Sequence, residues 1–84
     1  MSDLISETVR DIVSTKLGIR LSEELYETEI YRHREFENVL EEVGIELNIF
    51  IGDDDKEEIE NVQDLIDVCE RIQEENEKQR QKNG

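Results

Sequence analysis

The side chains that most often carry out catalysis are few in this chain. The single histidine, His33, stands between Arg32 and Arg34, and nearby positive charge favours its neutral, weakly basic form. The single cysteine, Cys69, can form no internal disulfide, and its apolar position on an expected helix indicates a buried thiol. No nucleophile pair, metal-binding cluster or phosphate loop accompanies these residues, so the sequence does not suggest an enzyme.

A run of three aspartates at residues 53–55 follows Gly52. A calcium loop would need oxygen ligands at alternating positions, a central glycine and a distal glutamate. A contiguous run behind a glycine instead indicates a turn and a helix start, where acidic side chains suit the positive helix end. We expect a brief helix over residues 55–60, with Ile59 turned inward.

Carboxylates are the dominant chemical group, with 24 acidic against 10 basic residues and a net charge of −14 at pH 7. This balance argues against binding to nucleic acid or to an anionic membrane, because both need basic patches. It favours a basic protein surface as the partner, reached by electrostatic steering. The alternative is that the charge serves only solubility.

Many of these carboxylates lie on a helix that we expect over residues 32–43, before a helix-ending glycine at Gly44. Its apolar face recurs at helical spacing and comprises Phe36, Val39, Leu40 and Val43. A basic cluster at residues 32–34 is unfavourable at a helix start, so we expect it to pair with nearby glutamates. The candidate partner-binding residues on the other faces are Glu35, Glu37, Glu41 and Glu42.

Two further helices are expected on either side of this one. The first spans residues 3–17 and ends at Gly18, with an apolar stripe of Ile5, Val9, Ile12, Val13 and Leu17. The last follows a cap at Asn61 and has a stripe of Val62, Leu65, Ile66, Cys69 and Ile72. Beyond that stripe, residues 73–84 are polar and predict a disordered tail, so residues 1–72 form the single acidic helical domain.

The connecting segments also carry apolar residues. Residues 19–31 indicate a long first loop packed on the core, with a short turn after Ser22, or else one continuous helix over residues 22–43. Residues 45–51 alternate apolar and polar except at Phe50, and we favour a packed loop over a strand, which would lack a partner. The predicted fold class is all-α: a small, monomeric three- to four-helix bundle. We expect its free energy of unfolding to be on the order of a few kcal/mol.

The order of these elements resembles the acyl carrier protein family. VRDIVSTKLGI at residues 9–19 is similar to the end of the family's first helix, and LEEVGIEL at residues 40–47 to the end of its second. IENVQDLIDVCERI at residues 59–72 is similar to its closing segment, and SEELYETEIY at residues 22–31 is a weaker match to the loop before the carrier site. The resemblance covers most of residues 3–72 and implies an acidic bundle with a dominant second helix and a short third helix.

The chemistry of that family depends on a serine in an Asp-Ser-Leu motif, which carries a 4′-phosphopantetheine arm. This sequence has no such motif, and residues 32–35, Arg-His-Arg-Glu, stand where it belongs. Only Ser22 among the four serines lies in a loop before helical sequence, so it is the alternative attachment site. Otherwise no cofactor and no metal are expected.

The sequence therefore favours an acyl-carrier-protein-like interaction module that lacks the arm and docks its acidic helix on a basic surface of a protein partner. Two alternatives are a functional acyl or peptidyl carrier with an irregular site at Ser22, and an acidic inhibitor or immunity-type protein. There is no signal peptide and no apolar run that could span a membrane, so a reducing cytoplasmic compartment is the expected location.

Overall fold

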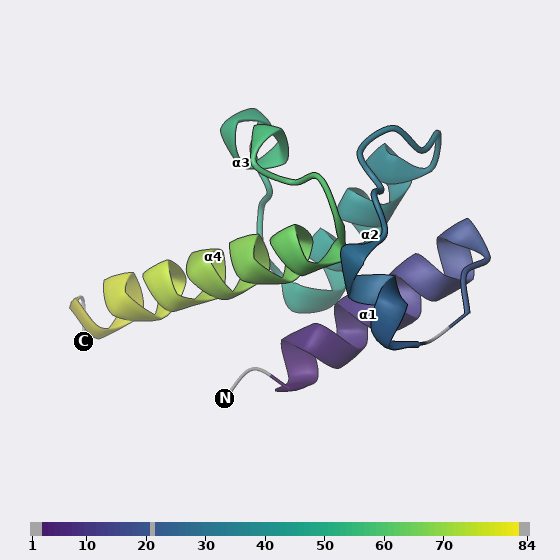
Figure 1. Cartoon of the computed structure of the whole chain (residues 1–84). Helices are drawn as coiled ribbons and strands as arrows, with labels where there is room; N and C mark the ends of the chain where they lie inside the picture. Colours follow the sequence, from purple (N-terminus) through teal and green to yellow (C-terminus); the bar gives the residue numbers. More distant parts are fainter. Residues whose placement is uncertain (1–2, 21, 83–84) are drawn as a thin grey trace.

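The computed structural model describes residues 3–20 and 22–82, which form four α-helices and one 3-10 helix. In chain order these are α1 (Asp3–Leu17), η1 (Glu23–Glu27), α2 (Phe36–Leu47), α3 (Asp53–Glu57) and α4 (Val62–Lys82) (Figure 1). The described residues contain no strand, only an isolated bridge between Glu29 and Asn61. The predicted all-α bundle with a long first loop is therefore confirmed.

The three longer helices pack around a common centre. Helix α1 contacts both α2 and α4, and η1 rests on α4. Figure 1 shows α3 on the opposite side of α4 from α1, and the C-terminal half of α4 extending past the other elements. Within the described residues, no helix combines the length and apolar character that crossing a membrane requires.

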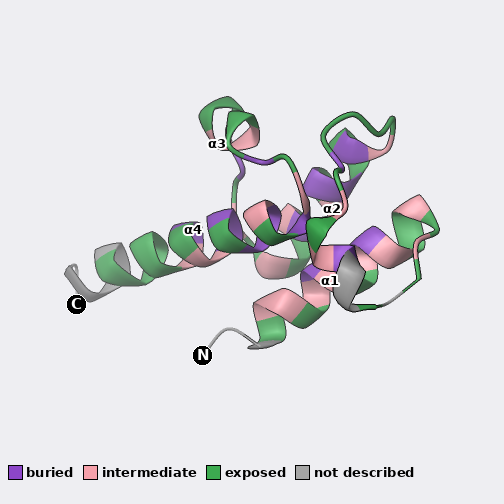
Figure 2. Ribbon diagram, viewed as in Figure 1, coloured by how far each residue is buried: buried purple, intermediate pink, exposed green. Residues whose placement is uncertain are grey.

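One apolar core joins all the predicted helical stripes, and it lies where the helices cross (Figure 2). The whole predicted stripe of α4 is buried, and Val68 joins it. The first loop is part of the core, because Leu25 and Ile30 are almost completely buried. The Ile30 N–H donates to the Glu60 carbonyl at 2.9 Å, which ties this loop to the connection before α4. The expected packing of the first loop is thus confirmed.

Helix α2 begins at Phe36 rather than at residue 32, so the expected start was wrong, as was a continuous helix over residues 22–43. Residues 31–35 form turns instead, in which the Phe36 N–H donates to the His33 carbonyl at 3.0 Å. The basic cluster therefore lies outside the helix, in the turns that precede its N-terminus. Among the described side chains, the expected pairing with glutamates does not form, and the Arg32 guanidinium instead lies 5.3 Å from the centre of the Tyr31 ring.

Helix α2 also ends later than expected, at Leu47 rather than before Gly44. Asn48 takes the left-handed conformation with φ of 56°, which asparagine tolerates better than most residues. The Ile49 N–H then donates to the Gly44 carbonyl at 2.9 Å, which satisfies one of the last free carbonyls of the helix. Residues 45–51 are consequently not a single loop, because residues 45–47 complete α2.

Helix α3 is shifted from its expected position and begins directly after Gly52. The Gly52 N–H donates to Asp55 Oδ2 at 3.3 Å, so the aspartate run starts the helix as its acidic first turn. Ile59 follows α3 and is buried, as expected. Arg71 on α4 pairs with Asp55 at 2.6 Å, which joins α3 to the last helix.

Helix α4 has the predicted cap, because Asn61 Oδ1 accepts the Asp64 N–H at 2.8 Å. It continues as a helix to Lys82, so the prediction of a disordered tail from residue 73 is wrong for the described residues. Residues 83–84 lie outside the described part of the chain. Glutamate, glutamine, lysine and arginine favour the helix even without burial, and Glu74 pairs with Lys78 one turn later at 3.6 Å. Among the described side chains, none beyond Ile72 is buried.

Cys69 is completely buried, and desolvation raises the pKa of its thiol from 9.0 to about 12. We expect the folded protein to react negligibly with a thiol reagent at pH 8, and the urea-unfolded chain to react rapidly. Because the unfolded thiol ionises first, stability should fall as the pH rises from about 9 to about 12. A colorimetric thiol assay checks the reactivity, and rapid modification of the folded protein would contradict this burial.

Candidate functional site

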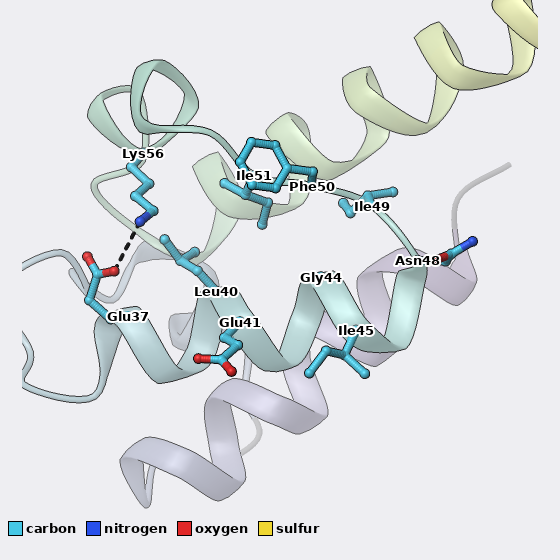
Figure 3. Close-up of a pocket in the computed structure, with 10 residues that line it drawn as sticks. All are labelled: Glu37, Leu40, Glu41, Gly44, Ile45, Asn48, Ile49, Phe50, Ile51 and Lys56. Atoms are coloured by element: carbon cyan, nitrogen blue, oxygen red, sulfur yellow. Dashed lines mark hydrogen bonds and ion pairs between the residues drawn. The ribbon is translucent and has the colours of Figure 1, made fainter.

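A groove of about 470 Å³ lies between α2 and the segment that follows it (Figure 3). One wall is a face of α2, where Glu37, Glu41 and Ile45 recur four residues apart, and Asn48 continues this wall just after the helix ends. The other wall consists of residues 49–51, which run back along the helix toward α3. The groove thus depends on the turn at Asn48, which reverses the chain.

Gly44 allows these two walls to approach each other. A Cβ atom at this position would lie 2.9 Å from the carbonyl oxygen of Ile49, closer than real Cβ atoms approach. The extended segment therefore rests directly on the backbone of α2. The same glycine that the sequence offers as a helix end is here a close-approach position inside the helix.

Apolar side chains form both the floor and the rim of the groove. Leu40 and Ile51 are buried at its floor. Phe50 and Ile45 stand on opposite sides in Figure 3, and they are 83% and 67% exposed. Sequence reasoning missed this rim, although Phe50 was the residue that broke the alternating pattern of residues 45–51. The groove therefore has exposed apolar side chains at its rim as well as buried ones at its floor.

The charge of the groove is negative. Lys56 Nζ lies 3.0 Å from Glu37 Oε1 and 3.7 Å from Asp53 Oδ1, and the hydrogen bond to Glu37 raises the pKa of this lysine above its ordinary value. Among the described residues that line the groove, Lys56 is the one cation, and it is already paired. Glu41 is exposed and forms no ion pair within the described part of the chain. Its charge therefore faces solvent at the rim.

The four glutamates predicted to bind a partner do not share one face. Glu37 and Glu41 line the groove, whereas Glu42 lines a separate shallow hollow on the α1 side. Glu35 precedes the first turn of α2 and accepts a hydrogen bond from Asn38 Nδ2 at 3.0 Å. The structure thus brings together two of the predicted residues and joins to them an apolar rim that the sequence did not reveal.

The other candidate residues lie apart from this groove. Ser22 is exposed and precedes η1, not α2, and its side chain makes no capping hydrogen bond. His33 is also exposed, and its Nδ1 accepts the Glu35 N–H at 3.0 Å. Within residues 3–20 and 22–82, no group of three or more histidine, cysteine, aspartate or glutamate side chains is placed to hold a metal ion.

Comparison with known proteins adds no assignment for this site. Neither a family model, nor a curated protein, nor a solved structure matches this chain. The resemblance to the acyl carrier protein family therefore stays a prediction from the sequence pattern.

Proposed function

We propose that this chain is an acidic protein-interaction module, similar to an acyl carrier protein without its arm, that docks the groove side of α2 on a basic surface of a protein partner. The observation that carries the proposal is the carboxylate of Glu41, which forms no ion pair with any described residue and lies on the same rim as the exposed Ile45 and Phe50. Charge and apolar contact can act together at this rim, because the charge orients the partner and the apolar contact holds it in place.

The net charge of −14 would guide this docking from a distance. Exposed carboxylates attract a basic surface before contact and raise the association rate, while the buried contacts that follow set the dissociation rate. Salt screens the attraction over about 8 Å at physiological ionic strength. Association should accordingly be fast and sensitive to salt.

No prosthetic group has a part in this proposal. The family serine motif is replaced by residues 32–35, and these residues form turns before α2. Ser22 is exposed, but it precedes the 3-10 helix rather than the acidic helix that would present an arm. The site therefore acts by binding, and its glutamates act as charges rather than as acids or bases.

Reversing two charges of α2, Glu41→Lys with Glu42→Lys, is expected to slow association with a basic partner about tenfold while the helical content stays unchanged. The partner would first be captured from an extract of the source cells with the tagged native chain, and its binding kinetics would then be measured at low and physiological salt. Both residues lie outside the buried core, so folding should survive the change.

A matched control is Glu75→Lys with Glu77→Lys, which makes the same change in net charge on the exposed part of α4 beyond the core. We expect this control to keep most of the native association rate. Equal binding by the native chain and both variants would refute docking through α2. Equal weakening by both variants would attribute the binding to net charge alone.

A further inference from the structure

We propose, on the basis of the proposed function, that the groove beside α2 receives the apolar face of a basic amphipathic helix supplied by the partner. Phe50 and Ile45 would contact apolar side chains of that helix, and Glu37 and Glu41 would face its lysines or arginines. The partner is thereby defined by the form of its docking element as well as by its charge.

The apolar part of the groove suits a row of side chains. Phe50 and Ile45 stand on its two sides, and between them Gly44 presents backbone without a side chain (Figure 3). The buried Leu40 and Ile51 form the floor, so an entering apolar side chain would meet apolar atoms below and on both sides. Aromatic side chains such as Phe50 are enriched at the centres of protein interfaces.

The charged part of the groove determines what must accompany the apolar side chains. Glu41 is unpaired within the described residues, and Glu37 is 71% exposed although it pairs with Lys56. A purely apolar occupant would remove water from these carboxylates without replacing it. An occupant with cations beside its apolar residues would satisfy them, and this combination is what a basic amphipathic helix carries.

A helix fits this surface better than a strand or a second copy of the chain. The described residues contain no β-strand, so they offer no sheet edge to which an extended peptide could add. A second copy would bring another 14 net negative charges to a rim that is already acidic. The charge complementarity therefore points to a cationic helix from a different protein.

The test uses a defined probe, a synthetic peptide of about 18 leucines and lysines ordered so that all leucines share one helical face. The control peptide has the same composition in scrambled order. Binding would be measured by calorimetry, and the contact surface by NMR chemical shifts of the labelled full chain. We expect the amphipathic peptide to bind at least about tenfold more tightly, with the largest shifts at Gly44, Ile45 and Phe50.

Phe50→Ala is expected to weaken binding of the amphipathic peptide about tenfold without unfolding the chain, because this side chain is 83% exposed. The matched control is Leu4→Ala, which removes an apolar side chain that is 72% exposed on α1, away from the groove, and should leave the affinity unchanged. Unchanged affinity in Phe50→Ala, or shifts centred on another surface, would overturn the proposal.

Two further outcomes separate this proposal from the proposed function. If both peptides bind equally and Glu41→Lys weakens both, docking by charge stands and the helix-in-groove proposal fails. If Glu41→Lys changes neither, both proposals fail. Self-association of the native chain in sedimentation experiments, abolished by Phe50→Ala, would assign the groove to a second copy and overturn the proposal in that way.

Discussion

Leu65→Ala is expected to leave most of the chain unfolded at room temperature. Leu65 is completely buried on α4, in the core to which α1, α2 and the first loop also contribute. Truncating a buried leucine costs about 2–5 kcal/mol, because apolar contacts are lost and a cavity remains. A small acidic domain has a free energy of unfolding on the order of a few kcal/mol, so the cost of this substitution is comparable to the stability of the whole domain. Far-UV circular dichroism and urea unfolding would measure it.

Leu4→Ala is the matched control, because it removes the same atoms from a side chain that is 72% exposed. Its effect on the free energy of unfolding should stay within about 0.5 kcal/mol. The difference between the two variants then isolates the effect of burial from that of helix propensity. A native urea midpoint for Leu65→Ala would mean that α4 does not pack into the core as described.

The sequence predicts the helices and their buried faces well, because the apolar residues of a buried helix face recur at helical spacing. Helix α1 has the expected bounds, and Gly18 after it takes the left-handed conformation with φ of 67°. The cap at Asn61 was also predictable, because the side chain that satisfies the free N–H groups belongs to the neighbouring sequence. Such features depend on residues within a few positions of each other.

The ends of α2 were not predictable in the same way. A glycine after an apolar stripe indicates either a helix end or a close approach of another segment, and Gly44 proved to be the second. The carbonyl that contacts it belongs to Ile49, which arrives there only because Asn48 turns the chain. The extension of α4 to Lys82 was missed because polar composition alone does not distinguish a solvated helix from a disordered tail.

The candidate site was predictable only in part. The spacing of four residues between Glu37 and Glu41 places them on one helix face, but the sequence gave no reason to choose these two from the four predicted glutamates. The choice follows from the return of residues 49–51 along the helix, which forms the groove and places Phe50 at its rim. A groove between two segments is a property of their packing, so one segment's pattern does not reveal it.

Gly44→Val tests the packing on which the groove depends, and we expect it to destabilise the chain by about 1–3 kcal/mol. In an uncrowded helix, replacing glycine usually adds stability through helix propensity. Here the new Cβ would lie 2.9 Å from the Ile49 carbonyl oxygen, so backbone rather than a flexible side chain must move. Residues 49–51 should shift away from α2, and the NMR signals of Ile49, Phe50 and Ile51 should move while the α1 core stays native.

Glu46→Val is the matched control for this variant. It places the same β-branched side chain on the same helix at an exposed position without the contact, and helix propensity alone would make Gly44→Val the more stable variant of the two. Urea unfolding of the two variants therefore separates propensity from packing. If Gly44→Val were more stable than Glu46→Val, the segment would not rest on α2, and the wall that carries Phe50 would not exist. If it were less stable and also bound the amphipathic leucine–lysine peptide more weakly, the close approach at Gly44 would support both the fold and the groove.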